Sequence, residues 1–246
     1  MNIMIIDFVF SLLFFPGLQE SAQGKLLADQ VAKKYETALG QVFAYQEKFK
    51  VLHPIFENLY PIAVVEEGTF FVFAPQSQEK RYILVASFPT KWPVPKGIRA
   101  SFPLEEYNNK PVCVVTGEVF DSAEGYVFVF HEFVHCHQFS TSEQTLKEKL
   151  QVYRNALKKK DFGWELEHPF PYPDQNFDST YAGMVEALDS GDAETVLACR
   201  RELRRILRPE NYEYMIWQEW KEGLARHLEN RMRALLGLPQ NQGGLS

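Results

Sequence analysis

Two histidines four residues apart, with a glutamate directly after the first, are the side chains of this sequence best suited to chemistry. They stand in the segment His131-Glu132-Phe133-Val134-His135, an HExxH motif. Residues four apart on a helix lie one turn above each other on the same face. Both imidazoles can then reach one Zn²⁺ ion at about 2.0–2.1 Å, so the spacing predicts a zinc site on a helix.

Glu132 is the expected proton carrier of this site. On a helix of about 3.6 residues per turn it points about 100° around the axis from His131. There its carboxylate can bind a metal-held water instead of the metal, take a proton from it and pass that proton on. A chance HExxH in such a chain arises on the order of once in a hundred. The alternative interpretation is a helix whose histidines are hydrogen-bonded structural groups.

A catalytic zinc site needs a third protein ligand and an open position for water. The first candidate is Glu222, which precedes Gly-Leu-Ala in a predicted helix. We expect it among apolar neighbours, where an unpaired carboxylate would be costly. Glu219 lies three residues earlier on the same helical face, so it is the alternative ligand or a hydrogen-bond acceptor for one histidine.

The HExxH segment and the Glu-Gly-Leu-Ala segment resemble the motifs of the gluzincin metallopeptidases, the relatives of thermolysin and the zinc aminopeptidases. In that family a second helix supplies a glutamate ligand, within a Glu-Gly-x-Ala signature in the aminopeptidase branch. The resemblance implies a zincin-like fold, Zn²⁺ on His131, His135 and Glu222, Glu132 as catalytic base, and a peptide or protein substrate. The 86 residues between the two motifs indicate an insertion or a different family layout.

Further roles around such a site are less specified by the sequence. An oxyanion-stabilising group is needed, and spacing does not choose among Tyr212, Tyr214, His168 and Arg205. The strand predicted at 112–117, just before the motif, is either a core strand or a sheet edge that pairs with an extended peptide. Cys136, His137 and His227 are expected to be structural, since His137 falls on a different helix face from His135.

Composition indicates a folded protein without a cationic field. The 246 residues are 46% hydrophobic and 24% charged, as is usual for globular domains. The 26 basic and 32 acidic residues give a net charge of −6, so nucleic acid is not an expected partner. The three cysteines form no CxxC pair, which argues against a disulfide framework or a cysteine-based zinc site. We expect one zincin-like domain over 25–246.

Residues 1–24 form an apolar segment with two interpretations. The segment resembles the hydrophobic region of a signal peptide, with a weak small-residue cleavage site near its end. No Lys or Arg precedes the apolar run, and Asp7 lies within it, which favours a helix that packs on the domain or on a partner. The run is short for a bilayer, so no integral membrane span is expected. The sequence leaves export and a cytoplasmic location equally open.

Hydrophobic periodicity predicts an α+β fold in which a sheet is followed by helices. Helical spacing of apolar residues runs over 25–49. Short β-rich runs then predict a small, mostly antiparallel sheet with strands at 62–65, 69–73, 82–88 and 112–116. Helices are predicted around 131–139, over 142–160, 180–188, up to 207 and from 209 to 236. The proline-rich loop at 161–178 is long enough to form a wall or lid.

The leading hypothesis is a gluzincin-type zinc metallopeptidase that hydrolyses peptide bonds with water activated by Glu132. A second is a non-catalytic zincin-like protein that holds the metal for stability, with a protein side chain in the fourth coordination position. A third is a metal-free domain with a chance motif, whose melting would not respond to a chelator. Substrate identity, endo- or exo-action and oligomeric state cannot be read from the sequence.

Overall fold

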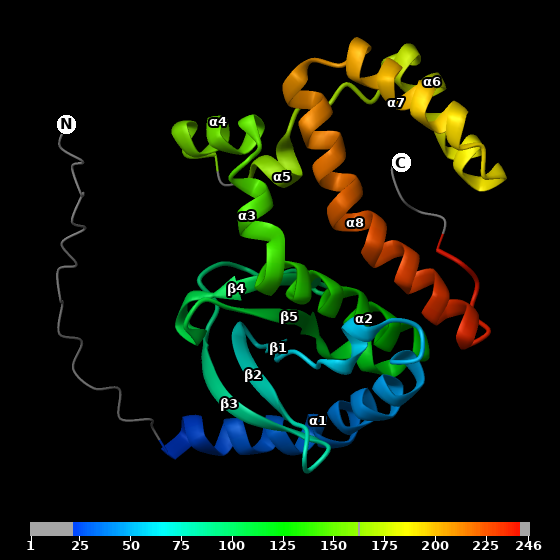
Figure 1. Ribbon diagram of the computed structural model, residues 1–246. Coiled ribbons are helices and arrows are strands. Elements are labelled where there is room, and N and C mark those ends of the chain that lie inside the picture. The colour runs from blue at the N-terminus through cyan, green and yellow to red at the C-terminus, as the bar shows by residue number, and fades with distance from the viewer. Residues whose placement is uncertain (1–21, 162, 242–246) are drawn as a thin grey trace, which may run out of the picture.

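The computed structural model describes residues 22–161 and 163–241 (Figure 1). Most of the apolar segment predicted as a signal peptide or packing helix, residues 1–21, lies outside the described residues. The first half of the chain holds a five-stranded sheet, and the second half is mostly helical. The predicted α+β class and the order of its elements are therefore confirmed. Across the described ranges, no helix is both long and apolar enough to cross a membrane.

The first helix, α1 (Ala22–Phe49), follows from the apolar periodicity of its sequence. Val31, Leu39 and Val42 are all buried on one side of it. It is followed by a single 3-10 turn, η1 (Pro54–Glu57), whose N-cap residue His53 accepts a hydrogen bond through its ring from the N–H of Ile55. The break that His53-Pro54 predicts therefore occurs where expected.

The sheet is mixed, with strand order β3-β2-β1-β5-β4. Strands β1 and β5 are parallel, and the other neighbouring pairs are antiparallel. The five strands are β1 (Ile62–Glu66), β2 (Thr69–Gln76), β3 (Arg81–Pro89), β4 (Arg99–Leu104) and β5 (Lys110–Thr116). The sheet is therefore small and mostly antiparallel, as the alternating runs predict.

Strand β4 was not predicted, and it decides between the two interpretations of 112–117. That segment is a core strand and not a sheet edge, because β5 lies between β1 and β4 and is paired on both sides. The sequence of β4 contains Pro103, which lowers its β-propensity but is tolerated on an edge strand. The edge next to the HExxH helix is therefore β4.

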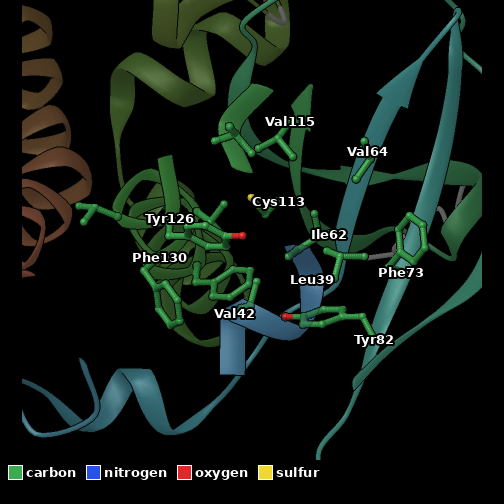
Figure 2. Close-up of a cluster of buried hydrophobic side chains, with 14 of the residues drawn as sticks. Leu39, Val42, Ile62, Val64, Phe73, Tyr82, Cys113, Val115, Tyr126 and Phe130 are labelled. Carbon is green, nitrogen blue, oxygen red and sulfur yellow. The ribbon is translucent and has the colours of Figure 1, made fainter. Parts of the chain in front are cut away.

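The main core lies between the sheet and two helices, α1 and α2 (Ala123–Gln138) (Figure 2). Alternation along the strands divides the side chains between the two faces. Ile62 and Val64 of β1 point toward the helices, and Ala63 and Val65 belong to a smaller cluster on the opposite face. Every second strand residue therefore contributes to the surface that supports α2.

The helical half differs from its prediction first over 142–160. The helix expected over 142–160 is interrupted, because Leu150 is extended (φ −80°, ψ 127°) and Glu213 accepts a hydrogen bond from the N–H of Val152. This cap comes from a distant segment, so local sequence could not reveal it. The helices after α2 are α3 (Gln144–Lys147), α4 (Gln151–Lys159), α5 (Trp164–Glu167), α6 (Gln175–Ser190), α7 (Ala193–Ile206) and α8 (Pro209–Leu235). A π-helical turn, Phe139–Glu143, joins α2 to α3.

Two predicted helix breaks are found in this half, and the predicted loop is found in part. Gly191 and Gly237 have φ of 75° and 70° at the ends of α6 and α8, the left-handed conformation that stops a helix. The loop expected at 161–178 contains α5 and the start of α6. Its proline-rich part, 168–174, is not helical, because prolines remove backbone donors.

Helix α8 connects the two large apolar clusters of the molecule. Tyr214 and Trp217, in its first half, pack in the cluster of the helical half. Leu228 and Met232, in its second half, pack in the main core under α2. Figure 1 shows α8 descending from α6 and α7 to α2. Glu222 therefore lies on α8 between the two clusters.

Candidate metal centre

The HExxH motif lies on α2, whose start is fixed by two local features. The Ser122 side chain accepts a hydrogen bond of 3.1 Å from the N–H of Gly125 and caps the helix. A Cβ at Gly125 would lie 1.6 Å from the carbonyl oxygen of Val119, so only glycine permits this close approach. Nearly every residue of α2 from Gly125 onward is buried, as expected of a helix that is apolar on all sides.

Helices α2 and α8 bring His131, His135 and Glu222 together. The Nε2 atoms of the two histidines are 3.1 Å apart. The Glu222 carboxylate oxygens lie 3.7 Å from His131 Nε2 and 3.6 Å from His135 Nε2. Two ligand atoms on a tetrahedral zinc ion are separated by about 3.3–3.4 Å. The donor atoms are thus spaced as a small divalent cation requires.

Glu222 is more exposed than its sequence suggested. The expectation of an apolar, buried environment is wrong, because 48% of its side chain is exposed while the side chains of His131 and His135 are 7% and 8% exposed. Gly223 and Leu224 are exposed beside it. The centre therefore has two buried nitrogen ligands and one carboxylate at its solvent-facing side.

The electrostatics of this cluster favour a positive charge between these residues. Burial opposes protonation of His131, but Glu222 and Glu229 outweigh it and raise the pKa of His131 to about 9. Burial also opposes ionisation of Glu222, yet contact with His131 and His135 holds the pKa of its carboxyl well below the usual range. A cation bound at this point would meet the same field.

The Glu132 carboxyl is buried next to the histidines. The residue is 7% exposed, and burial raises its pKa even though His135 and His131 act in the opposite direction. Within the described part of the chain, no side-chain hydrogen bond engages its carboxylate. A buried carboxyl without a side-chain hydrogen-bond partner is a candidate proton acceptor.

Gln138 supports His135, a role that the sequence reasoning missed. Its Nε2 donates to the carbonyl oxygens of Trp220 and Lys221 at 3.0 and 3.1 Å. Its Oε1 lies 2.9 Å from His135 Nδ1 and is therefore the acceptor of this hydrogen bond. Because Nδ1 donates to Gln138, the lone pair on His135 Nε2 is free for a ligand. Gln138 thus fixes this ring and joins α2 to α8 directly before Glu222. Its position three residues after His135 is the signal that could have identified it.

Glu229 occupies the corresponding place behind His131 and was also missed. Its side chain is fully buried, and its Oε2 lies 2.9 Å from His131 Nδ1, although the ring N–H is not aligned for a hydrogen bond. Arg226 and Arg233 bind this carboxylate at 2.7 and 2.8 Å. Burial is opposed by contacts with His131, Asn241 and Arg233, which lower the pKa of Glu229 to about 2. Its spacing, two helical turns after Glu222, places both on one face.

The remaining residues considered from sequence have other contacts. Glu219, the alternative to Glu222, pairs with Arg200 at 2.6 Å and does not belong to the group formed by the two histidines and Glu222. His137 Nδ1 is 3.0 Å from the Tyr60 hydroxyl, Cys136 is buried beside Ser101, and His227 is exposed. All three cysteines are free.

The four oxyanion candidates have polar groups engaged elsewhere or pack in the helical half. Tyr214 donates to the carbonyl of Glu165, and His168 Nε2 is 2.9 Å from Asn211. Arg205 pairs with Glu202 on the surface. Tyr212 packs at the edge of the helical cluster. The structure therefore does not assign this role.

No family model, curated protein or solved structure matches the chain. Among the residues that the structure describes, His131, His135 and Glu222 are the one group of three or more His, Cys, Asp or Glu side chains with ligand atoms this close, all within 4.8 Å. This arrangement can hold a divalent cation and leave room for water on the side of Glu222.

Proposed function

We propose that this chain is a zinc-dependent peptide hydrolase of gluzincin type. The observation that carries the proposal is the convergence of His131, His135 and Glu222 from two helices, with the buried Glu132 beside them. Two histidines and a glutamate are a ligand set that catalytic zinc uses. The HExxH and Glu-Gly-x-Ala motifs resemble those of the gluzincins, and here they meet in space.

The proposed chemistry divides between the bound ion and the protein. Zn²⁺ at the three ligands would supply Lewis acidity, which lowers the pKa of a water and polarises a carbonyl. Glu132 takes the proton of the attacking water and delivers it to the leaving amine as the C–N bond breaks. Gln138 and Glu229 keep the two imidazole rings oriented, each from the nitrogen that faces away from the ligand position.

The number of ligands favours an enzyme over a protein that uses metal only for stability. Structural zinc sites are closed by four protein ligands, whereas catalytic sites keep one position open. Within 22–161 and 163–241, three such side chains meet and no fourth joins them. The exposure of Glu222 gives a substrate access to that position.

Metal content of purified protein tests the ligand assignment. We expect about one zinc per chain by elemental mass spectrometry, lost in Glu222→Gln. Glu219→Gln is the matched control, one turn away on the same helix, and should keep the metal. Wild-type protein without zinc after reconstitution, or equal losses in both variants, would contradict the site.

Glu132→Gln separates metal binding from catalysis. We expect this variant to keep its zinc and to lose cleavage of a peptide library followed by mass spectrometry. Cleavage that persists in the variant, with contaminating peptidases excluded, would refute the role of Glu132. Zinc-loaded wild type that cleaves no peptide would support the non-catalytic alternative.

A further inference from the structure

A cavity of about 300 Å³ lies between the first half of α8, α6 and the proline-rich segment ahead of α6. Aromatic rings make up much of its wall, and they are Phe170, Tyr172, Phe177, Tyr181 and Tyr214. Burial and the nearby Glu219 carboxylate raise the pKa of Tyr181 to about 12, so this phenol is neutral at physiological pH. The cavity is large enough for one long side chain.

The charged groups of this cavity are acidic, and its other polar groups are the tyrosine hydroxyls and the Gln218 amide. Asp178 and Glu219 belong to its lining, which contains no Lys, Arg or His. Glu219 Oε2 binds Arg200, but Glu219 Oε1 is buried and has no hydrogen-bond partner among the described residues. A buried carboxylate oxygen without a donor is unfavourable. The Tyr181 hydroxyl interacts with this carboxylate, but within the described part of the chain no donor meets hydrogen-bond geometry at Oε1.

The cavity lies on the face of α8 that carries Glu222. At about 100° per residue, Met215, Gln218 and Glu219 of its lining all fall within about 60° of Glu222 around the helix axis. Gln218 is four residues from Glu222, a rise of about 6 Å. One extended peptide residue spans about 3.3–3.6 Å. A substrate chain at the metal centre thus reaches the cavity within about two residues.

We propose that this cavity, defined by its five aromatic residues with Asp178 and Glu219, binds the Lys or Arg side chain of a peptide substrate. The inference rests on the proposed function, because it assigns the cavity to a peptide held at the metal centre. Aromatic faces attract a cation. The cation also donates to Glu219 Oε1, and Asp178 adds a second negative charge at the exposed rim.

An apolar side chain fits these observations less well. It would fill the aromatic part of the cavity but leave Glu219 Oε1 buried and unpaired, which is penalised. An acidic side chain would face two carboxylates. The ammonium or guanidinium group of Lys or Arg satisfies the oxygen and the rings together.

Binding of a matched peptide pair tests this inference without catalysis. The probes are an alanine-rich peptide with one lysine and the same peptide with norleucine, which keeps the chain length and removes the charge. They are titrated by calorimetry into zinc-loaded Glu132→Gln protein. We expect the lysine peptide to bind roughly tenfold more tightly, and Glu219→Gln or Asp178→Asn to remove most of that difference.

One control variant and one test variant at an exposed position distinguish loss of the cavity's charge from misfolding. Glu186→Gln removes an exposed carboxylate of α6 outside the cavity, and the lysine preference should survive it. Asp178 is exposed, so Asp178→Asn should fold even where loss of the Glu219–Arg200 pair disturbs the helices.

The outcomes separate this inference from the proposed function. A lysine preference that depends on Glu219 and Asp178 supports the cavity assignment, even if wild-type protein cleaves nothing. Equal binding of both peptides overturns the assignment, and it does so even if wild-type protein cleaves peptides. Tighter binding of the norleucine peptide would identify the cavity as an apolar site and also overturn it.

Discussion

The buried carboxylate of Glu229 is expected to contribute both to folding and to the metal centre. Glu229→Gln keeps the side-chain shape and removes a charge that Arg226 and Arg233 share at 2.7 and 2.8 Å. Breaking a buried ion pair by changing one partner costs about 3–5 kcal/mol. Arg233 keeps Glu124 at 2.6 Å, so we expect a loss of about 3 kcal/mol, from a total of about 5–15 kcal/mol.

The same change should weaken zinc binding. Glu229 lies behind His131, with Oε2 2.9 Å from Nδ1, and loss of such a supporting group lowers metal affinity about 10- to 100-fold. The lower end is expected for Glu229→Gln, because the amide keeps an oxygen close to His131 Nδ1 and loses only the charge. Tenfold corresponds to about 1.4 kcal/mol of binding free energy.

Two measurements on the same protein separate these effects. Urea unfolding of zinc-free protein gives the stability change, and competition with a chromophoric chelator gives the zinc affinity of the folded variant. Glu202→Gln is the control, because Glu202 also pairs with an arginine three residues away, but at the exposed surface of α7. It should change neither quantity measurably.

The reasoning would be refuted by a variant that unfolds at the same urea concentration as wild type. A variant that loses stability but binds zinc with unchanged affinity would show that Glu229 supports the fold alone. Its assigned role in orienting His131 would then be wrong.

Three further predictions concern the scaffold. The pKa of Glu165 is lowered because its two lysine partners outweigh burial. The loss of stability caused by Glu165→Gln should therefore be largest at pH 7 and should shrink as the pH falls below 4.5, the ordinary pKa of a glutamate. Urea unfolding at several pH values measures this loss. Phe130→Ala should cost about 3–5 kcal/mol in denaturant unfolding, because this ring is fully buried among other rings. Gly125→Ala should lower the melting temperature markedly, because the new Cβ would clash with Val119. Gly223→Ala, which has open space around it, should raise stability by about 0.5–1 kcal/mol. Equal effects of the two variants would contradict the close approach of Gly125 to Val119.

Local sequence by itself determined the features that depend only on the periodicity or the end of a single helix or strand. Four-residue spacing puts His131 and His135 on one face wherever the segment is helical. Alternation along β1 and β2 and the apolar period of α1 specify the core faces. Gly191 and Gly237 stop helices through a backbone conformation that glycine adopts readily.

Only the tertiary structure decided which groups meet from different elements. The choice between Glu222 and Glu219 depends on how α8 crosses α2. The two residues lie about one turn apart along α8, and only Glu222 is beside the histidines, while Glu219 pairs with Arg200. Strand β4 exists because β5 offers it a partner, which its own proline-containing sequence does not reveal. Glu229 reaches His131 from a segment that is distant in sequence. Gln138 is close to His135 in sequence, but its hydrogen bonds to α8 are likewise long-range. Long-range packing, which no local pattern encodes, thus completed the centre.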